Sequence, residues 1–205
     1  MNNASLFSKE DATKINSQVL LRYARVAQGE GGKLFRYPIG RAGLDGLGYD
    51  KATTALLPDD IASTFCGVSN VFSAAPVAPG AGVLDIGCGA GVDTIIAARM
   101  AGPAGKAAGI DLTPGMIALA QDNAKRAGAS NVSFMQASAE SLPFPDGSFH
   151  LVTSNGVFNL VIDKEKALAE AWRVLRPGGR LAIADQTLAD ESPRGVDTMT
   201  RNWGR

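Results

Sequence analysis

One stretch constrains the fold of this chain more than any other: residues 83–91 read VLDIGCGAG. Three apolar residues and Asp85 form a short buried strand, which runs into a turn where three glycines alternate with small residues. Apolar side chains at helical spacing follow, from Ile95 to Met100. Such a turn lets a ligand approach the backbone, and the free N–H groups of the helix start bind a carboxylate or phosphate. The stretch predicts a strand, a glycine turn and a helix arranged around a ligand.

The glycine spacing bears on which ligand this is. The dinucleotide fingerprint is G-x-G-x-x-G, whereas this chain has G-x-G-x-G with an acid two residues before the first glycine. A carboxylate beside a pyrophosphate is unfavourable, while at Asp85 it suits a ligand with a positive amino group. The spacing disfavours a nicotinamide-dependent oxidoreductase, which we keep as the weaker alternative function.

Strands alternate with helices along the rest of the chain. Apolar runs predict strands over 83–86, 107–111, 132–137, 150–154 and 180–185, and periodic apolar positions predict helices over 14–28, 49–57, 59–65, 114–127 and 163–175. A glycine-rich loop with aromatic residues is expected over 29–48. Alternation of this kind indicates an α/β fold with a parallel sheet and right-handed crossovers.

Composition excludes several classes of protein. The 205 residues carry 20 basic and 20 acidic side chains with no basic run, so no nucleic-acid partner is expected. No apolar run is long enough to span a membrane, and Cys66 and Cys88 lie too far apart for a zinc pattern. We therefore expect a cytoplasmic protein without a metal site or a membrane partner.

The motif around Asp85 resembles the first motif of class I S-adenosylmethionine-dependent methyltransferases, [DE]-x-G-x-G-x-G. Two further segments, ASAESLPF over 137–144 and WRVLRPGG over 172–179, resemble methyltransferases that act on ubiquinone precursors and on arsenite. Residues 46–49, 67–70, 111–117 and 154–160 resemble the arsenite branch more narrowly. The resemblance implies a doubly wound, Rossmann-like sheet of strand order 3-2-1-4-5.

The resemblance also implies a site for S-adenosylmethionine, released as S-adenosylhomocysteine, at the carboxyl ends of the first four strands. Asp85 and the glycines would hold its amino-acid part, Asp111 the ribose hydroxyls, and Ser138 to Glu140 the adenine edge, with Met116 on the adenine face. The full set of expected cofactor-binding residues is Asp85, Gly87, Cys88, Gly89, Gly91, Asp111, Leu112, Met116, Ser138, Ala139, Glu140 and Asn155.

The sequence departs from the arsenite branch at the residues that would bind arsenic. In that branch cysteine thiolates hold the metalloid, but here Val68 and Gly156 stand in the matching segments. Cys66 is two places away and forms no thiolate cluster alone. His150 stands where the family usually has an acid. It is either a general base or a residue without a catalytic role, at the end of its strand that lies away from the ligand site. No catalytic residue is assigned.

These features predict a methyltransferase acting on a small-molecule acceptor. The alternative from another class is a protein that binds S-adenosylmethionine without turnover, as a pseudoenzyme, a partner subunit or a truncated form. We expect residues 1–75 to form a helical lid and residues 76–205 the binding domain. Related enzymes continue past the fifth strand with antiparallel strands that are missing here, so we expect a truncated form or a homodimer that covers this strand's edge.

Overall fold

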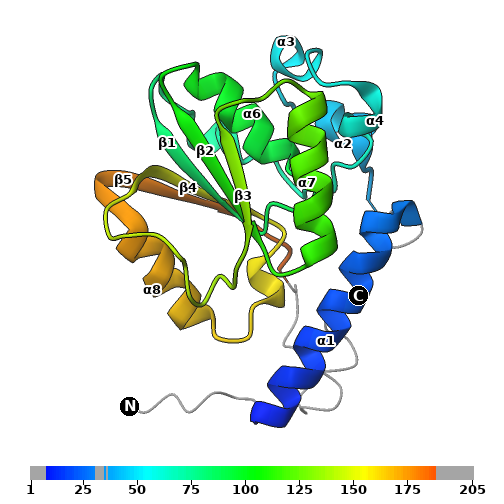
Figure 1. Cartoon of the computed structure of the whole chain (residues 1–205), viewed down its shortest axis with the longest axis vertical. Helices are drawn as coiled ribbons and strands as arrows, with labels where there is room; N and C mark the ends of the chain where they lie inside the picture. Colours follow the sequence, from blue (N-terminus) through cyan, green and yellow to red (C-terminus); the bar gives the residue numbers. More distant parts are fainter. Residues whose placement is uncertain (1–7, 31–34, 36, 188–205) are drawn as a thin grey trace.

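The computed structural model describes residues 8–30, 35 and 37–187, and its centre is a five-stranded sheet with helices on both faces (Figure 1). All neighbouring strands are parallel, in the order β3-β2-β1-β4-β5. The strands are β1 (Gly82–Ile86), β2 (Lys106–Asp111), β3 (Val132–Gln136), β4 (Phe149–Asn155) and β5 (Leu175–Ala184). The predicted fold class and strand order are confirmed.

Alternating side chains of the central strands divide the core into two clusters. Val83 and Leu151 pack with α6 (Val92–Ala101) on one face, joined by Ala124 from α7 (Pro114–Arg126). Leu84 and Val152 pack on the other face against α8 (Lys164–Val174). Because both faces of β1 are buried, its strand is apolar at nearly every position, and Asp85 is the exception.

The segment before β1 holds more helix than the sequence indicates. Helix α1 spans Lys9–Arg25 and starts earlier than predicted, because the Ser8 hydroxyl accepts from the Asp11 N–H while the Asp11 carboxylate accepts from the Ser8 N–H. A further turn, η1 (Val26–Glu30), follows and is kinked at Gly29, whose φ is +91°. The short helices are α2 (Gly40–Gly46), inside the predicted loop, α3 (Lys51–Thr54), α4 (Asp59–Ala62) and α5 (Val71–Ala74). None of the helices in the described part of the chain is long and apolar enough to cross a membrane.

The junction of α8 and β5 differs from the prediction. The helix ends at Val174 and β5 begins at once, with Leu175 paired to Phe149, so the strand includes the Pro-Gly-Gly stretch expected to separate the two. The buried face of α8 consists of Ala167, Ala171 and Val174. Leu168 and Trp172 fit the apolar spacing of the helix predicted over 163–175, which would turn them inward. They are 41% and 75% exposed, because each lies one position beyond the stripe that contacts the sheet.

Candidate functional site

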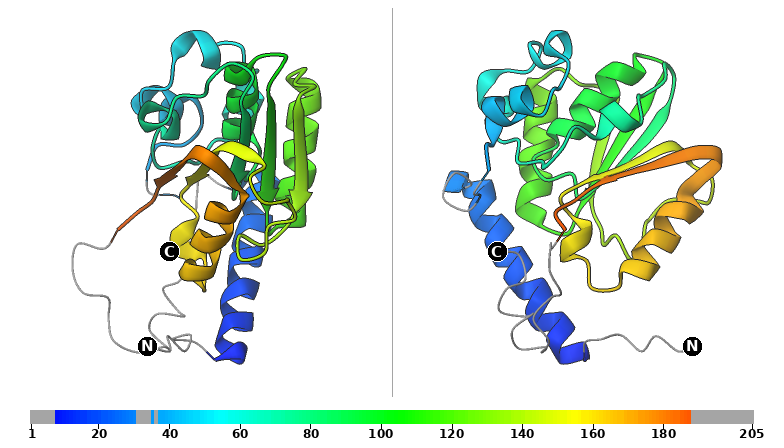
Figure 2. Two further views of the ribbon diagram at one scale, coloured as in Figure 1. Left: turned by 90° about the vertical axis from the view of Figure 1, so that its left-hand side faces the viewer. Right: turned by 180° about the vertical axis from the view of Figure 1, so that it is seen from behind.

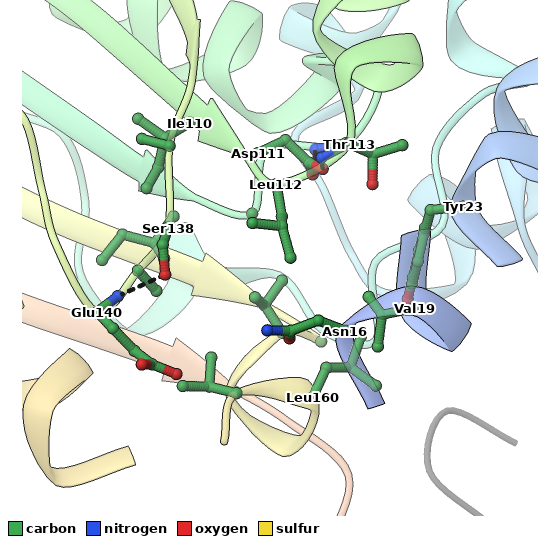
Figure 3. Close-up of a pocket in the computed structure, with 18 of the residues that line it drawn as sticks. Asn16, Val19, Tyr23, Ile110, Asp111, Leu112, Thr113, Ser138, Glu140 and Leu160 are labelled. Carbon is green, nitrogen blue, oxygen red and sulfur yellow. Dashed lines mark hydrogen bonds between the residues drawn. The ribbon is translucent and has the colours of Figure 1, made fainter. Parts of the chain in front are cut away.

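A pocket opens at the carboxyl ends of β1, β2 and β4 and beside the segment after β3 (Figure 3). It encloses about 830 Å³, counting the space that is open to solvent. Helix α1 also lines it, so the walls come from both the sheet and the N-terminal segment. Figure 2 shows this helix beside the end of the sheet at which the strands end. Of the expected cofactor-binding residues, those that line it are Gly87, Gly89, Asp111, Leu112, Ser138, Ala139, Glu140 and Asn155. Asp85, Cys88, Gly91 and Met116 lie outside this lining.

The three glycines after β1 share a positive φ but differ in the space around them. Gly87 has φ +74° and a Cβ there would fall 2.2 Å from the Val157 side chain, so neither the conformation nor the space admits another residue. Gly91 has φ +82° and a Cβ there would fall 2.8 Å from the Phe134 ring. Gly89 has φ +51° but faces open space and lines the pocket. Gly87 and Gly89 both line the pocket, and Gly89 is the one with open space where a side chain would begin.

Asp111 joins the ends of two strands at the pocket. Its Oδ2 accepts from the Gly89 N–H at 3.0 Å and its Oδ1 accepts from the Thr113 N–H at 2.8 Å. Burial raises the pKa of this carboxyl, although the backbone N–H groups oppose the shift. A carboxylate accepts about four hydrogen bonds, and the Gly89 and Thr113 N–H groups supply two of them. Asp111 is thus held in place with acceptor capacity left for a ligand hydroxyl.

The segment after β3 forms the opposite wall of the pocket, facing Asp111 and Leu112 (Figure 3). The Glu140 N–H donates to the Ser138 hydroxyl at 3.2 Å, and the Glu140 carboxylate accepts from the Asp163 N–H at the start of α8. This places Ser138 and Glu140 together at the rim. Met116 is fully buried on α7 and lines a separate hollow, so its contact with a ligand stays a prediction.

Asp85 lies behind the glycine turn, 2% exposed. Its carboxylate accepts from the Thr94 hydroxyl at 2.7 Å and the Thr153 hydroxyl at 3.1 Å. Asp93, in the first turn of α6 and 7% exposed, is the next acid. Burial and the charge of Asp93 raise the pKa of Asp85 to about 7, and burial raises that of Asp93 to about 6. Neither carboxylate lines the pocket, so the pair would attract a cationic group of a bound ligand electrostatically and without direct contact.

Several residues of the site were missed from the sequence. Asn16, Val19 and Tyr23 of α1 line the pocket, and Cys66 lies near them. Their i, i+3, i+7 spacing is that of an amphipathic helix face, but it does not tell which surface the face meets. Asp93 carried a clearer signal, because it is the single acid in a helix that is otherwise almost entirely apolar.

The two positions matching the arsenic-binding segments are neighbours in space. A Cβ at Gly156 would lie 3.5 Å from the Val68 side chain. Because valine and glycine supply no thiolate, this point of the site has no soft ligand for a metalloid. Across the described residues, no group of three or more histidine, cysteine, aspartate or glutamate side chains is arranged to hold a metal ion.

His150 lies away from the pocket. Its Nδ1 accepts from the N–H of Gly82, the first residue of β1, at 3.0 Å, whereas the pocket is at the opposite ends of the strands. This position favours a structural role for His150 over that of a general base.

The charges of the pocket wall fit a cationic ligand. The titratable groups among its described lining residues are Tyr23, Cys66, Asp111 and Glu140, with no lysine, arginine or histidine. A pyrophosphate would therefore find no basic side chain there, while a sulfonium and an ammonium group would find acids at the wall and the buried Asp85–Asp93 pair behind it. The residues present fit S-adenosylmethionine and disfavour a dinucleotide.

Comparisons with known proteins agree with this pocket. Residues 78–204 match the methyltransferase domain family. The chain is 42% identical over 144 residues to an arsenite methyltransferase of Halobacterium salinarum, covering 70% of this chain and 37% of that protein. It is 43% identical over 110 residues to a ubiquinone/menaquinone biosynthesis C-methyltransferase, UbiE, of Hahella chejuensis, covering 53% of this chain and 44% of that one.

A solved structure, that of an arsenic(III) S-adenosylmethionine methyltransferase from Chlamydomonas reinhardtii, superposes with a TM-score of 0.59 at 36% identity. The match covers 66% of this chain and 48% of that one, so the chain spans less than half the length of these three relatives. The family match covers more than half of this chain and includes the strand, glycine turn and acid that build the pocket. The chain belongs to the class I S-adenosylmethionine-dependent methyltransferase family.

Proposed function

We propose that this protein transfers a methyl group from S-adenosylmethionine to a small-molecule acceptor. The observation that carries the proposal is Asp111, bonded to the Gly89 N–H at a pocket whose described lining residues include no basic side chain. The relatives are named for arsenite and for quinone biosynthesis, both small acceptors, which supports the acceptor class. Val68 and Gly156 argue against arsenite itself, because they offer no thiolate.

The bound cofactor supplies an electrophilic methyl group on its sulfonium. The chain's part is to bind, orient and exclude water, because methyl transfer is an in-line displacement whose rate depends on alignment. Asp111 and the glycine turn would fix the ribose, Ser138 to Glu140 the adenine edge, and α1 would close the pocket to solvent. Such a reaction requires no nucleophilic residue of the protein, and none is assigned.

Calorimetric titration tests the cofactor half of the proposal. We expect saturable binding of S-adenosylmethionine and S-adenosylhomocysteine, and no binding of NADH at the same concentrations. NADH binding alone would establish the oxidoreductase alternative. Transfer of a labelled methyl group to a panel of small acceptors then separates an enzyme from a protein that binds without turnover. Cofactor binding with no transfer to any acceptor would favour that second reading.

The N-terminal segment is proposed as a lid over the cofactor, which divides the chain near residue 75. Support comes from Val19 and Tyr23, which line the pocket from α1. We expect hydrogen exchange over 14–23 and 35–49 to slow when S-adenosylhomocysteine binds. Val19→Asp should weaken binding, because Val19 is buried against the pocket, whereas Leu21→Asp on the exposed side of the same helix should not. Equal effects of the two variants would contradict the lid.

A homodimer that covers the edge of β5 is a further proposal. Within the described residues β5 is a terminal strand of the sheet, and Ile183 on it is 40% exposed. Unpaired parallel edges tend to be covered. Light scattering should give twice the mass of one chain, and Ile183→Lys should halve it by placing a charge at the edge. Leu168→Lys, on the exposed side of α8, is the matched control and should leave the dimer intact. A monomer in the unmodified protein would end this proposal.

We also propose a cytoplasmic location. Both cysteines of the chain, Cys66 and Cys88, are free thiols, the state that a reducing compartment maintains. Cell fractionation tests this, and recovery with an oxidising compartment would contradict it.

A further inference from the structure

The side chain of Asn155, at the carboxyl end of β4, joins segments that are far apart in the sequence. Its Oδ1 accepts from the Val68 N–H at 2.8 Å and the Ser69 N–H at 3.2 Å. Its Nδ2 donates to the Ser69 carbonyl at 2.8 Å and to Asp93 Oδ2 at 2.9 Å. The amide is therefore fully used within the protein, although Asn155 also lines the cofactor pocket.

Neighbouring residues are fitted to this amide. A Cβ at Gly67 would fall 2.3 Å from Asn155 Nδ2, so the amide packs directly on the backbone there. The Tyr49 hydroxyl lies 2.7 Å from Asp93 Oδ1 and 3.0 Å from the Ser69 carbonyl. Asp93 thus accepts from Asn155 with one oxygen and from Tyr49 with the other. Together Asn155, Tyr49 and Asp93 form a partly buried junction that holds the backbone of residues 67–69.

The segment held in this way separates two pockets. Cys66 lines the cofactor pocket, whereas Gly67, Val68 and Ser69 line a second pocket of about 1120 Å³, counted to its open side. The lining of the second pocket also includes Asp185, after β5. Residues 66–69 therefore form a wall between the two spaces, and we refer to them below as the wall.

The second pocket has a distinct chemistry. Its described lining residues are mostly glycine, alanine and other apolar residues, and their titratable groups are Tyr37 and Asp185. No lysine, arginine or histidine is among them, so a carboxylate or phosphate entering there would meet no cationic partner. The lining suits an uncharged, largely apolar molecule.

We propose that Asn155 is a positioning residue, whose amide fixes the wall between the cofactor pocket and an acceptor pocket for uncharged molecules. The inference rests on the proposed function, because the wall matters to catalysis only if a methyl donor occupies the first pocket. Asn155 acts through the wall rather than on the reacting atoms. It sets where an acceptor meets the methyl group, and alignment of this kind controls the rate of an in-line displacement.

Asn155→Asp tests the role of the amide without changing its shape. The new carboxylate keeps the acceptor for the N–H groups of Val68 and Ser69. It loses the donors to the Ser69 carbonyl and to Asp93, and it faces that acid. At pH 8 we expect protection from hydrogen exchange at residues 67–70 to fall at least about tenfold, since a hydrogen bond to a charged group is lost. At pH 5 protection should return in part, because one proton shared between the new carboxyl and Asp93 restores that bond but not the one to the Ser69 carbonyl. Asp85, Tyr49 and Cys66 are the other titratable groups near the junction, and all three are present in the unmodified protein. Because Asp85 itself titrates between these pH values, protection in the variant is compared with that of the unmodified protein at the same pH.

Asn131→Asp is the matched control. The Asn131 amide donates to the carbonyls of Ala98, Gly102 and Gly105, away from both pockets, so its loss should leave exchange at 67–70 unchanged at either pH. If Asn155→Asp does not fold, Tyr49→Phe removes a hydroxyl from the same junction and should reduce protection at residue 69 by a smaller factor. Unchanged exchange in the Asn155 and Tyr49 variants, or an equal effect of Asn131→Asp, would overturn the positioning role.

Two small probes test the acceptor pocket in the unmodified protein with S-adenosylhomocysteine bound. We expect 2-naphthol, which is uncharged at pH 7, to slow exchange at 67–69, and 2-naphthoate, its anionic counterpart, to leave it unchanged. Equal effects of both probes, or no effect of either, would overturn the assignment of this pocket. Failure of S-adenosylhomocysteine to bind would instead overturn the proposed function, and exchange in the ligand-free variants would still decide the role of Asn155.

Discussion

Replacing Asp111 by alanine is expected to weaken the binding of S-adenosylhomocysteine by about 10- to 100-fold. A hydrogen bond to a charged group contributes about 1.5–3 kcal/mol, and each 1.4 kcal/mol is a factor of ten in affinity. Asp111 lines the pocket, and its two oxygens are held by the N–H groups of Gly89 and Thr113. The variant loses the carboxylate that would accept hydrogen bonds from the ligand's ribose hydroxyls. It also loses the hydrogen bond from the Gly89 N–H that shapes the glycine turn. Calorimetric titration measures the change.

A ligand analogue separates these two losses. S-adenosylhomocysteine without its ribose hydroxyls should bind the unmodified protein about as weakly as the complete ligand binds Asp111→Ala. The variant should no longer distinguish the two ligands if Asp111 holds the hydroxyls. Asp111→Asn keeps the shape and one acceptor oxygen, so its affinity should lie between. Unchanged affinity of Asp111→Ala would refute the assignment, and continued discrimination between the ligands would show that another group holds the ribose.

The sheet could be predicted from sequence because its signals are local and mutually consistent. Apolar runs ending in Asp85 and Asp111 mark strands, and the glycines between them fix where the first turn lies. The same logic places Gly89, Asp111 and Ser138 to Glu140 around one pocket, because the carboxyl ends of parallel strands meet at one edge. Predicting that these residues line one pocket required no information about long-range packing.

Other features depend on contacts that sequence patterns do not encode. Trp172 fits an apolar helix stripe, yet alanines and Val174 form the stripe that meets the sheet. Asp85 was expected to face the ligand, but its strand position turns it toward Thr94 and Thr153. The contact of Tyr49 with Asn155 joins residues 106 positions apart, and the periodic patterns used to predict helices and strands contain no information about such a pairing.

The buried acids should make the stability of the fold depend on pH. Burial raises the pKa of Asp85 from 3.8 to about 7, with Asp93 as the second cause. The folded state therefore binds more protons than the unfolded chain between pH about 4 and 7, and its stability is expected to fall as pH rises through that range. Since one unit of pKa shift corresponds to about 1.4 kcal/mol, the loss for the Asp85–Asp93 pair together is on the order of a few kcal/mol.

Asp85→Asn should remove much of this pH dependence. The amide keeps hydrogen bonds with Thr94 and Thr153, whose hydroxyls can turn to donate or accept, while the charge disappears. Denaturant unfolding at pH 5, 6.5 and 8 should show the variant more stable than the unmodified protein at pH 8 and nearly equal at pH 5. Asp122→Asn, the same change on an exposed acid of α7, should leave the pH dependence as it is. Parallel curves for Asp85→Asn and the unmodified protein would contradict the assignment.

The same variant should bind the cationic cofactor more weakly. The charge of Asp85 would attract the cofactor's cationic groups across the glycine turn, so affinity for S-adenosylmethionine at pH 8 should fall by about tenfold. Stability and affinity then change in opposite directions, because the charge that the fold disfavours is the one the ligand requires. A variant that gains stability and keeps full affinity would show that Asp85 takes no part in binding. One that loses both would show that its carboxylate is needed for the turn itself.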